Sequence, residues 1–253
     1  MLDDKHMKNE TQNPNGEKIA KVMAHAGLCS RRDAEQWITD GRVVLNGTVL
    51  TNPAERVSDN DTIKVDGKII GQKVPTRLFL YHKPVGLLTT HKDEHGRPTV
   101  FDNLPKNLPR LISVGRLDLN SEGLLLLTTD GELSRYLELP ATGWTRRYRV
   151  RVFGNLDEQA LKDLEKGITV EGIHYGSIKV NIESRKGQNS WLSVSLKEGK
   201  NREIRRVMAA LNLDVNRLVR QSYGPFQLGT LARGNVKEVY GEVLRQQIPG
   251  YFK

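Results

Sequence analysis

Residues 113–131 read SVGRLDLNSEGLLLLTTDG and contain the strongest structural signal in the chain. Asp118 lies in the turn-prone first half, and the leucine run 124–127 follows it closely. A short apolar run bounded by turn residues predicts a buried β-strand. A polar loop in front of a rigid strand can hold one carboxylate at a surface cleft, but aspartates in turns also cap their own backbone. The pattern alone therefore leaves open whether Asp118 is functional or only stabilises its turn.

The composition indicates a packed globular protein with room for a main domain and a small accessory domain. Of the 253 residues, 37% are hydrophobic and 27% are charged, which is ordinary for a soluble chain. No apolar run approaches the length of a membrane span, and residues 1–8 lack the apolar segment of a signal peptide. The single cysteine, Cys29, excludes an internal disulfide and a cysteine metal cluster. We therefore expect a cytoplasmic protein without a membrane partner.

The charge distribution points to a polyanionic partner for the larger part of the chain. The formal net charge is +9, and an excess of this size favours nucleic acid as a partner. Residues 76–253 hold 28 basic and 19 acidic residues, whereas residues 17–75 hold nine and eight. A nucleic-acid site in the smaller part must therefore depend on a local cluster.

The chain divides into four segments by composition and periodicity. Residues 1–16 are polar and aperiodic, so we expect a disordered tail there. A small domain is expected over 17–70, a linker over 71–76, and a large domain over 77–250. In the large domain, strand and helix signals intermingle, which predicts an α+β fold built on a mixed, mostly antiparallel sheet.

Two helices and a small sheet are predicted for the small domain. Apolar residues in 19–26 have the spacing of one helix face, which Gly27 ends. Ser30, with Asp33 three residues later, predicts the N-cap of a second helix that ends at Gly41. That helix should bury three side chains, Ala34, Trp37 and Ile38. Residues 43–50 then form a hairpin around an Asn-Gly turn, and 62–70 supply further strand.

Four motifs in order resemble the pseudouridine synthases that modify ribosomal RNA. They are YHKPVG (81–86), the GRLD segment (115–118), RYRVRVFG (147–154) and EGKNREIRR (198–206). The run GRPTVFD (96–102) is most similar to members that act on the large-subunit RNA. In the small domain, AGLCSRRDA (26–34) and GRVVLNG (41–47) resemble the S4 RNA-binding domain. The resemblance covers about residues 17–250 and predicts a small S4-type α/β domain followed by a synthase domain.

The resemblance implies an isomerase that detaches uracil from ribose, turns it and rejoins it through carbon five. This reaction implies no cofactor and no metal, and the target uridine must leave its stack to be reached. The expected partner is ribosomal RNA, most specifically the large-subunit precursor, bound by a monomer. The catalytic residues implied by the motifs are Asp118, Tyr148 and Arg205, with Arg205 paired to the Asp118 carboxylate.

The patterns around Tyr148 and Arg205 are compatible with these roles and also with purely structural ones. Residues 147–152 alternate, so the arginines share one strand face and Tyr148 shares the other. An inward tyrosine fits a core role, and it also fits stacking on an extruded base. Residues 202–211 read as a helix whose basic start opposes the helix dipole, so a negative partner would compensate. A plain surface arginine remains the alternative for Arg205.

Basic residues near these motifs are the candidate RNA-binding residues. Those at 31 and 32 fall at a helix N-terminus, where free N–H groups and guanidinium forks both suit phosphate, although a solvated basic turn is the alternative. Lys18, Lys21 and Arg42 are weaker members of the same candidate patch. The candidates are Lys18, Arg31, Arg32, Arg42, Arg116, Arg147, Arg149, Arg151, Lys200, Arg202 and Arg206.

Other interpretations of the chain make distinct predictions. His91, Glu94 and His95 have the spacing of a zinc peptidase motif, but the polar stretch runs into Gly96 and Pro98, which predicts a loop. A methyltransferase would need a glycine-rich cofactor loop, and the sequence has none. A non-catalytic RNA-binding protein would tolerate replacement of Asp118. A synthase acting on small-subunit RNA is the nearest alternative to the large-subunit enzyme.

Overall fold

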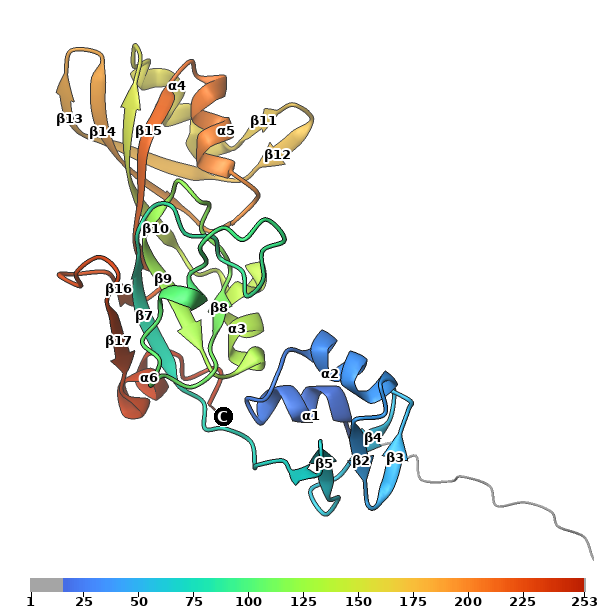
Figure 1. Cartoon of the computed structure of the whole chain (residues 1–253). Coiled ribbons are helices and arrows are strands. Elements are labelled where there is room, and N and C mark those ends of the chain that lie inside the picture. The colour runs from blue at the N-terminus through green and yellow to red at the C-terminus, as the bar shows by residue number, and fades with distance from the viewer. Residues whose placement is uncertain (1–15, 253) are drawn as a thin grey trace, which may run out of the picture. The chain divides into compact units, whose positions relative to one another are not determined.

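The computed structural model describes residues 16–252, and the chain separates into two compact units, Met1–Pro75 and Thr76–Lys253 (Figure 1). The break lies within the residues predicted as a linker, 71–76. Apart from Gly16, the predicted tail 1–16 lies outside the described residues.

The first unit contains two helices and short strands around its own apolar core. Its elements are β1 (Glu17–Lys18), α1 (Ile19–His25), α2 (Arg31–Thr39), β2 (Val43–Leu45), β3 (Thr48–Leu50), β4 (Arg56–Val57), β5 (Ile63–Val65) and β6 (Lys68–Ile69). Strands β3, β2, β5 and β6 form a four-stranded sheet in that order. The predicted helices, hairpin and additional strands are therefore all present.

Local sequence signals account for the ends of these elements. The Ser30 hydroxyl accepts a hydrogen bond from the Asp33 N–H at 3.1 Å, and the Asp33 carboxylate accepts one from the Ser30 N–H at 3.2 Å, which forms a capping box at the start of α2. In the β2–β3 turn, Asn46 and Gly47 have φ values of 50° and 90°, as a two-residue hairpin turn requires. Both predictions are confirmed.

One burial prediction for α2 needs correction. Ala34 and Ile38 are fully buried as expected, but Trp37 is only half-buried. The Arg42 guanidinium lies 4.6 Å from the centre of its ring. A cation can remain partly hydrated while it covers an aromatic face, so the indole lies at the surface of the core instead of inside it.

The second unit is built on a nine-stranded, mostly antiparallel sheet. Seven of its strands follow the order β13-β14-β10-β15-β9-β7-β17, with β8 paired to β9 and β16 to β15. The β9–β15 pair is parallel, and the other ladders of this sheet are antiparallel. These strands are β7 (Leu78–Lys83), β8 (Ile112–Val114), β9 (Glu122–Thr128), β10 (Arg146–Phe153), β13 (Ile178–Lys186), β14 (Asn189–Leu196), β15 (Asp214–Tyr223), β16 (Phe226–Gln227) and β17 (Val236–Val239).

Helices and a separate hairpin pack around this sheet. They are the short 3₁₀ segments η1 (Phe101–Asn103), η2 (Pro140–Thr142) and η3 (Leu164–Lys166), the helices α3 (Gly131–Glu138), α4 (Glu158–Asp163), α5 (Glu203–Ala210) and α6 (Gly241–Gln247), and the hairpin of β11 (Ile168–Val170) with β12 (Ile173–Tyr175). The predicted α+β class with a mostly antiparallel sheet is confirmed.

Strand β9 explains the leucine run. Every residue of β9 is buried. Leu125 and Leu127 pack into one apolar cluster, and Leu124 and Leu126 pack into another on the opposite side of the sheet. A strand covered on both faces has no need of alternating polar residues. The loop that contains Asp118 is therefore anchored to one of the most deeply buried strands in the unit.

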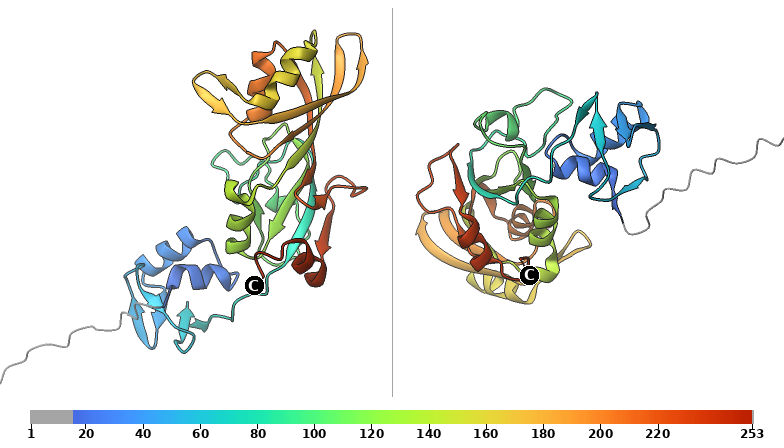
Figure 2. Two further views of the ribbon diagram at one scale, coloured as in Figure 1. Left: turned by 180° about the vertical axis from the view of Figure 1, so that it is seen from behind. Right: turned by 90° about the horizontal axis from the view of Figure 1, so that it is seen from below.

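The strands β10, β13 and β14 are covered on one side only. In Figure 1 and in the left view of Figure 2, α4 and α5 lie along one side of these strands, and no helix of the second unit within residues 76–252 lies along the other. The burial of β10 agrees, because Tyr148, Val150 and Val152 are buried while Arg147 and Arg151 are exposed. The predicted separation of the arginine face from Tyr148 is confirmed.

Candidate active site

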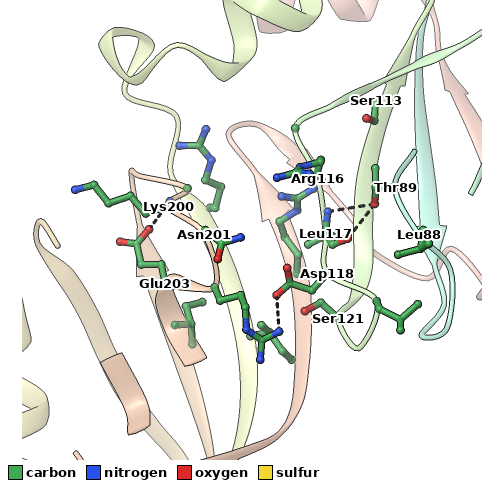
Figure 3. Close-up of a pocket in the computed structure, with 18 of the residues that line it drawn as sticks. Leu88, Thr89, Ser113, Arg116, Leu117, Asp118, Ser121, Lys200, Asn201 and Glu203 are labelled. Carbon is green, nitrogen blue, oxygen red and sulfur yellow. Dashed lines mark hydrogen bonds and ion pairs between the residues drawn. The ribbon is translucent and has the colours of Figure 1, made fainter. Parts of the chain in front are cut away.

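A cleft of about 1370 Å³ lies in the second unit and is lined by Asp118 and Tyr148. Figure 3 shows Arg116, Asp118 and Ser121 on one wall and Lys200, Asn201 and Glu203 on the facing wall. One wall is thus the loop before β9, and the other is the turn before α5. The structure brings together two predicted catalytic residues with Arg116, Lys200 and Arg202, three of the predicted RNA-binding residues.

The loop 115–121 is held by hydrogen bonds along its backbone. Gly115 N–H donates to the Glu138 carboxylate at 2.9 Å. The Thr89 hydroxyl donates to the Leu117 carbonyl at 2.9 Å, and the Gly86 N–H donates to the Leu119 carbonyl at 2.8 Å. Because the backbone is fixed by partners from several other segments, the Asp118 side chain projects from a preorganised loop.

Lys83 is the central support of this loop. Its side chain is fully buried at the end of β7, and its Nζ donates to the carbonyls of Pro84 at 3.0 Å, Asp118 at 3.1 Å and Ser121 at 2.9 Å. Burial lowers the pKa of Lys83 to about 8, and the nearby Asp118 and Glu122 carboxylates oppose that shift. The ammonium thus stabilises the loop through charge-assisted hydrogen bonds in a low-dielectric site.

The expected ion pair between Arg205 and Asp118 is replaced by one from Arg202. The Arg202 Nη1 lies 3.7 Å from the Asp118 Oδ2, and both side chains are partly exposed. Arg202 has a left-handed backbone with φ of 52°, and the Glu203 carboxylate accepts a hydrogen bond from the Lys200 N–H at 2.9 Å. This tight turn precedes the first residue of α5, so the helix pattern alone does not indicate where the Arg202 side chain points.

Arg205 contacts the backbone of the same loop instead of its carboxylate. Its Nη2 donates to the Asn120 carbonyl and its Nη1 to the Val215 carbonyl, both at 2.9 Å. Burial and the neighbouring Arg202 lower its pKa, while Asp118 opposes the shift. The guanidinium fork therefore joins the loop of Asp118 to β15, which corrects the predicted direct pairing.

Tyr148 lies on the inner face of β10, as predicted, and borders the cleft with an exposure of 9%. In the register with β15 it stands opposite Arg220, which also lines the cleft and is almost fully buried. The Arg220 Nε donates to the Leu124 carbonyl at 2.7 Å. An aromatic side chain and a buried guanidinium thus form adjacent parts of the cleft wall.

The remaining predicted RNA-binding residues lie in other places. Arg206 is half-buried on α5 and does not line the cleft, and Arg147, Arg149 and Arg151 lie on the opposite face of the sheet from Tyr148. In the first unit, Lys18, Arg31 and Arg32 are exposed, and the Arg42 fork binds the Asp66 carboxylate at 3.0 and 2.6 Å. The side chain of Lys21 forms an ion pair with Glu17.

The segment with zinc-peptidase spacing is a loop, as predicted. The His91 ring stacks on Phe101 with centroids 3.6 Å apart, and the Arg97 guanidinium donates to Asp93, which holds the pKa of that carboxyl well below its usual range. Among residues 16–252, no group of three or more His, Cys, Asp and Glu residues could hold a metal ion. No helix in this range is long and apolar enough to cross a membrane.

Sequence reasoning missed Lys83 and Arg220. Lys83 lies within the quoted YHKPVG motif, and alternation along β7 places it on the same side as Phe79 and Tyr81. That alternation was the available signal, since a lysine in line with two buried aromatic residues must find a buried partner. Arg220 carries no comparable local signal.

Comparisons with known proteins establish the family. The model described as RNA pseudouridylate synthase matches residues 77–210, more than half of the chain, and the S4 domain model matches residues 17–63. The chain therefore belongs to the RNA pseudouridylate synthase family and is an RNA-modifying isomerase with an S4 domain. This confirms the resemblance drawn from the motifs, and it removes support for a methyltransferase or a non-catalytic binding protein.

Curated relatives agree over most of the chain. A protein named uncharacterized RNA pseudouridine synthase from Rickettsia felis is 46% identical over 91% of this chain and 100% of its own length. Proteins named ribosomal large subunit pseudouridine synthase B are 42% identical in Pasteurella multocida (92% of this chain, 70% of the relative) and 43% in Salmonella typhi (88% and 79%).

A solved structure supports the fold. A crystal structure titled as a pseudouridylate synthase covers 92% of this chain and 99% of its own, with a TM-score of 0.66 and 23% identity. At this identity, the likeness concerns the fold alone.

Proposed function

We propose that this enzyme converts a specific uridine of large-subunit (23S) ribosomal RNA to pseudouridine, with Asp118 as the catalytic carboxylate. The observation that carries the proposal is the Asp118 loop, which lines the cleft and is held by Lys83 and Arg205 through backbone carbonyls. The names of the two synthase B relatives and the motif at 96–102 support the large-subunit RNA as substrate.

The reaction breaks the bond between N1 of uracil and C1′ of ribose and forms a bond from C5 to C1′. The C5 hydrogen leaves as a proton and N1 gains one, so the product is an isomer of the substrate. The uridine must leave its stack to enter the cleft, at a cost of a few kcal/mol. Tyr148 offers an aromatic face that restores stacking to the extruded base.

Each side chain has a separate proposed task. Asp118 acts on the sugar or the base, as nucleophile or as proton acceptor. Arg202 forms an ion pair with its carboxylate and orients it in the cleft. Arg205 and Lys83 position the loop from behind, and Arg116 and Lys200 at the cleft edge contact RNA phosphates.

The first prediction is that Asp118→Asn abolishes turnover while leaving folding and RNA affinity near wild type. The amide keeps the shape of the carboxylate and loses its charge and basicity. Tritium release from RNA labelled at C5 of uridine measures the reaction directly. Asp214→Asn, an exposed aspartate at the start of β15, is the matched control and should retain wild-type turnover. Substantial tritium release by purified Asp118→Asn enzyme would remove Asp118 from the catalytic role.

The identity of the substrate RNA is tested separately. Pseudouridines are mapped in both ribosomal RNAs from cells with and without this gene. The proposal expects one or a few sites to disappear from the large-subunit RNA. Loss confined to the small-subunit RNA would favour the alternative target and would leave the catalytic assignment intact.

A further inference from the structure

We propose that the sheet face opposite the cleft is a second RNA-binding surface, which holds a segment of the substrate RNA remote from the target uridine. This inference rests on the proposed function. We call this surface the outer face, and it consists of Arg147, Arg149, Arg151, Lys179, Trp191 and Arg217.

The outer face is a polar surface that no helix or strand of residues 76–252 covers. The strand register gives two rows of neighbours across the sheet. One row runs from Lys179 on β13 through Ser195 on β14 to Arg147 on β10. The other runs from Trp191 on β14 through Arg151 on β10 to Arg217 on β15. The outward residues are exposed or half-buried, whereas the inward residues of β10 and β14 are buried. The face is therefore accessible in the isolated second unit, and its chemistry is that of cations on a flat sheet.

The fold itself does not explain these cations. Arg151 stands directly opposite Arg217 on the neighbouring strand, and like charges in such a pair destabilise a sheet. Neither Arg147 nor Arg151 has an ion-pair partner within residues 16–252, whereas Arg149 and Arg217 each have one. Since Glu122 already compensates Arg217, the uncompensated charges are those of Arg147 and Arg151, and a partner that brings negative charge is the simplest reason for them.

The acidic groups near the face pair with two of its five cations, and within residues 16–252 they leave Arg147, Arg151 and Lys179 without an ion-pair partner. Glu183 holds Arg149 at 2.7 Å, and the buried Glu122 is bound by Arg217 and, at 3.3 Å, by Arg233. The guanidinium groups of Arg149 and Arg217 also lie over the Trp191 ring, 4.3 and 5.9 Å from its centre. The guanidinium groups of Arg149 and Arg217 are thus held in place. Guanidinium groups that are already ordered bind phosphate at a smaller cost in conformational entropy.

Spacing favours a nucleic-acid backbone over an acidic protein. Outward side chains on β10 recur every second residue, about 6.8 Å apart along the strand. Successive phosphates of an RNA strand have a comparable separation, and the three arginines occupy alternate positions of one strand. Because the row lies on the far side of the sheet from Tyr148, one short hairpin in the cleft cannot also reach it. The surface should therefore matter for large RNA and be silent for a minimal substrate.

The test compares Arg147→Gln with Arg151→Gln, made together in the full chain, with the control pair Arg135→Gln and Arg245→Gln. All four arginines are exposed, and the control residues lie on α3 and α6. Binding is measured from about 50 to 300 mM salt, a range over which the Debye length falls by more than half. The two RNAs are a 23S ribosomal RNA transcript and a short hairpin that contains the mapped uridine. Unfolding by urea checks stability.

We expect the outer-face pair to lower the log–log salt slope on the long RNA by about 0.7 to 0.9 for each phosphate that is no longer neutralised. The slope of this pair on the hairpin, and the slopes of the control pair on both RNAs, should match wild type. Stability should be unchanged or slightly higher, since the like-charge pair is relieved. Equal slopes for both pairs on the long RNA would overturn the inference. If the outer-face pair binds naked RNA normally but no longer binds ribosomal precursor particles, the face binds an acidic protein. That result would also overturn the inference.

These measurements do not depend on catalysis. Suppose that the salt slope on the long RNA is steeper for the wild-type enzyme than for the outer-face pair, but that the wild-type enzyme forms no pseudouridine in this RNA. The proposed function then fails, and the outer face stands as an RNA-binding surface. If the wild-type enzyme forms pseudouridine but its salt slope on the long RNA equals that of the outer-face pair, the proposed function stands and the outer face is not an RNA-binding surface.

Discussion

Two arginines near Asp118 act on different parts of the same loop. Arg202 meets the carboxylate at 3.7 Å in a partly exposed pair, whereas Arg205 bonds two backbone carbonyls at 2.9 Å from a half-buried position. Exposed ion pairs contribute about 0.2 to 1 kcal/mol. Misplacing a catalytic group by about 1 Å can cost on the order of a hundredfold in rate. Positioning by Arg205 should therefore matter more than the ion pair of Arg202.

This comparison gives a prediction for single-turnover rates. Arg205→Met should reduce the rate roughly a hundredfold, because the Asn120 and Val215 carbonyls lose their shared donor. Arg202→Met should reduce it about fivefold or less, as expected for an exposed pair. Arg205→Lys keeps the charge but loses the fork, so it should resemble Arg205→Met. A larger defect in Arg202→Met than in Arg205→Met would show that the carboxylate partner, and not the loop support, controls the rate.

At the scale of elements, the sequence predicted what depends on neighbours in the chain. The capping box at Ser30, the turn at Asn46 and Gly47, the buried β9 and the two faces of β10 all follow from local patterns. Such features are determined within a few residues of one another, so periodicity and turn chemistry suffice.

The supports of the loop could not be predicted in the same way. The Asn120 carbonyl and Arg205 are 85 positions apart, and the Asp118 carbonyl and Lys83 are 35 apart. No local period relates such pairs, because their contact is a product of sheet order. The expected pairing of Arg205 with the Asp118 carboxylate was wrong for this reason. Arg205 does contact the loop of Asp118, but at the Asn120 carbonyl and not at the carboxylate.

The loop and β7 together give a pH prediction. When charged, Lys83 shares its three N–H donors among four carbonyls, the fourth being that of Leu119 at 3.5 Å, and burial lowers its pKa from an ordinary value of 10.5 to about 8. The neutral amine has two donors in place of three. Turnover should therefore fall as pH rises through about 8, because the loop loses part of its support.

The same group has the opposite effect on stability. Between about pH 8 and 10.5 the unfolded chain holds the Lys83 proton while the folded chain has released it. Stability rises with pH wherever the unfolded state binds more protons, so the contribution of Lys83 to the free energy of unfolding increases across this window. From about pH 7 to 10, the contribution of Lys83 should raise the free energy of unfolding measured in urea, while the single-turnover rate should fall. Turnover that stays constant through about pH 9.5, well above the folded-state pKa of Lys83, would contradict the role of the ammonium.

At the scale of the whole molecule, the cleft and the S4 domain belong to separate units. Each unit has its own apolar core, and the cleft is formed by the second unit alone. Arg31 and Arg32 are exposed in the first turn of α2, next to a capped N-terminus, while the bulk positive charge belongs to residues 76–253. We therefore expect the S4 domain to add affinity without affecting the chemical step.

Arg31→Ala with Arg32→Ala tests this division of tasks. The pair should weaken RNA binding and lower the log–log salt slope by about 0.7 to 0.9 for each phosphate that these arginines neutralise in the wild type. Turnover at saturating RNA should match wild type, because no residue of the cleft has changed. Lys64→Ala with Lys68→Ala removes two exposed charges from β5 and β6 of the same unit and should leave the slope unaltered. A slope unchanged from wild type would mean that Arg31 and Arg32 are only solvated, and a fall in saturating turnover would mean that the S4 domain also shapes the cleft.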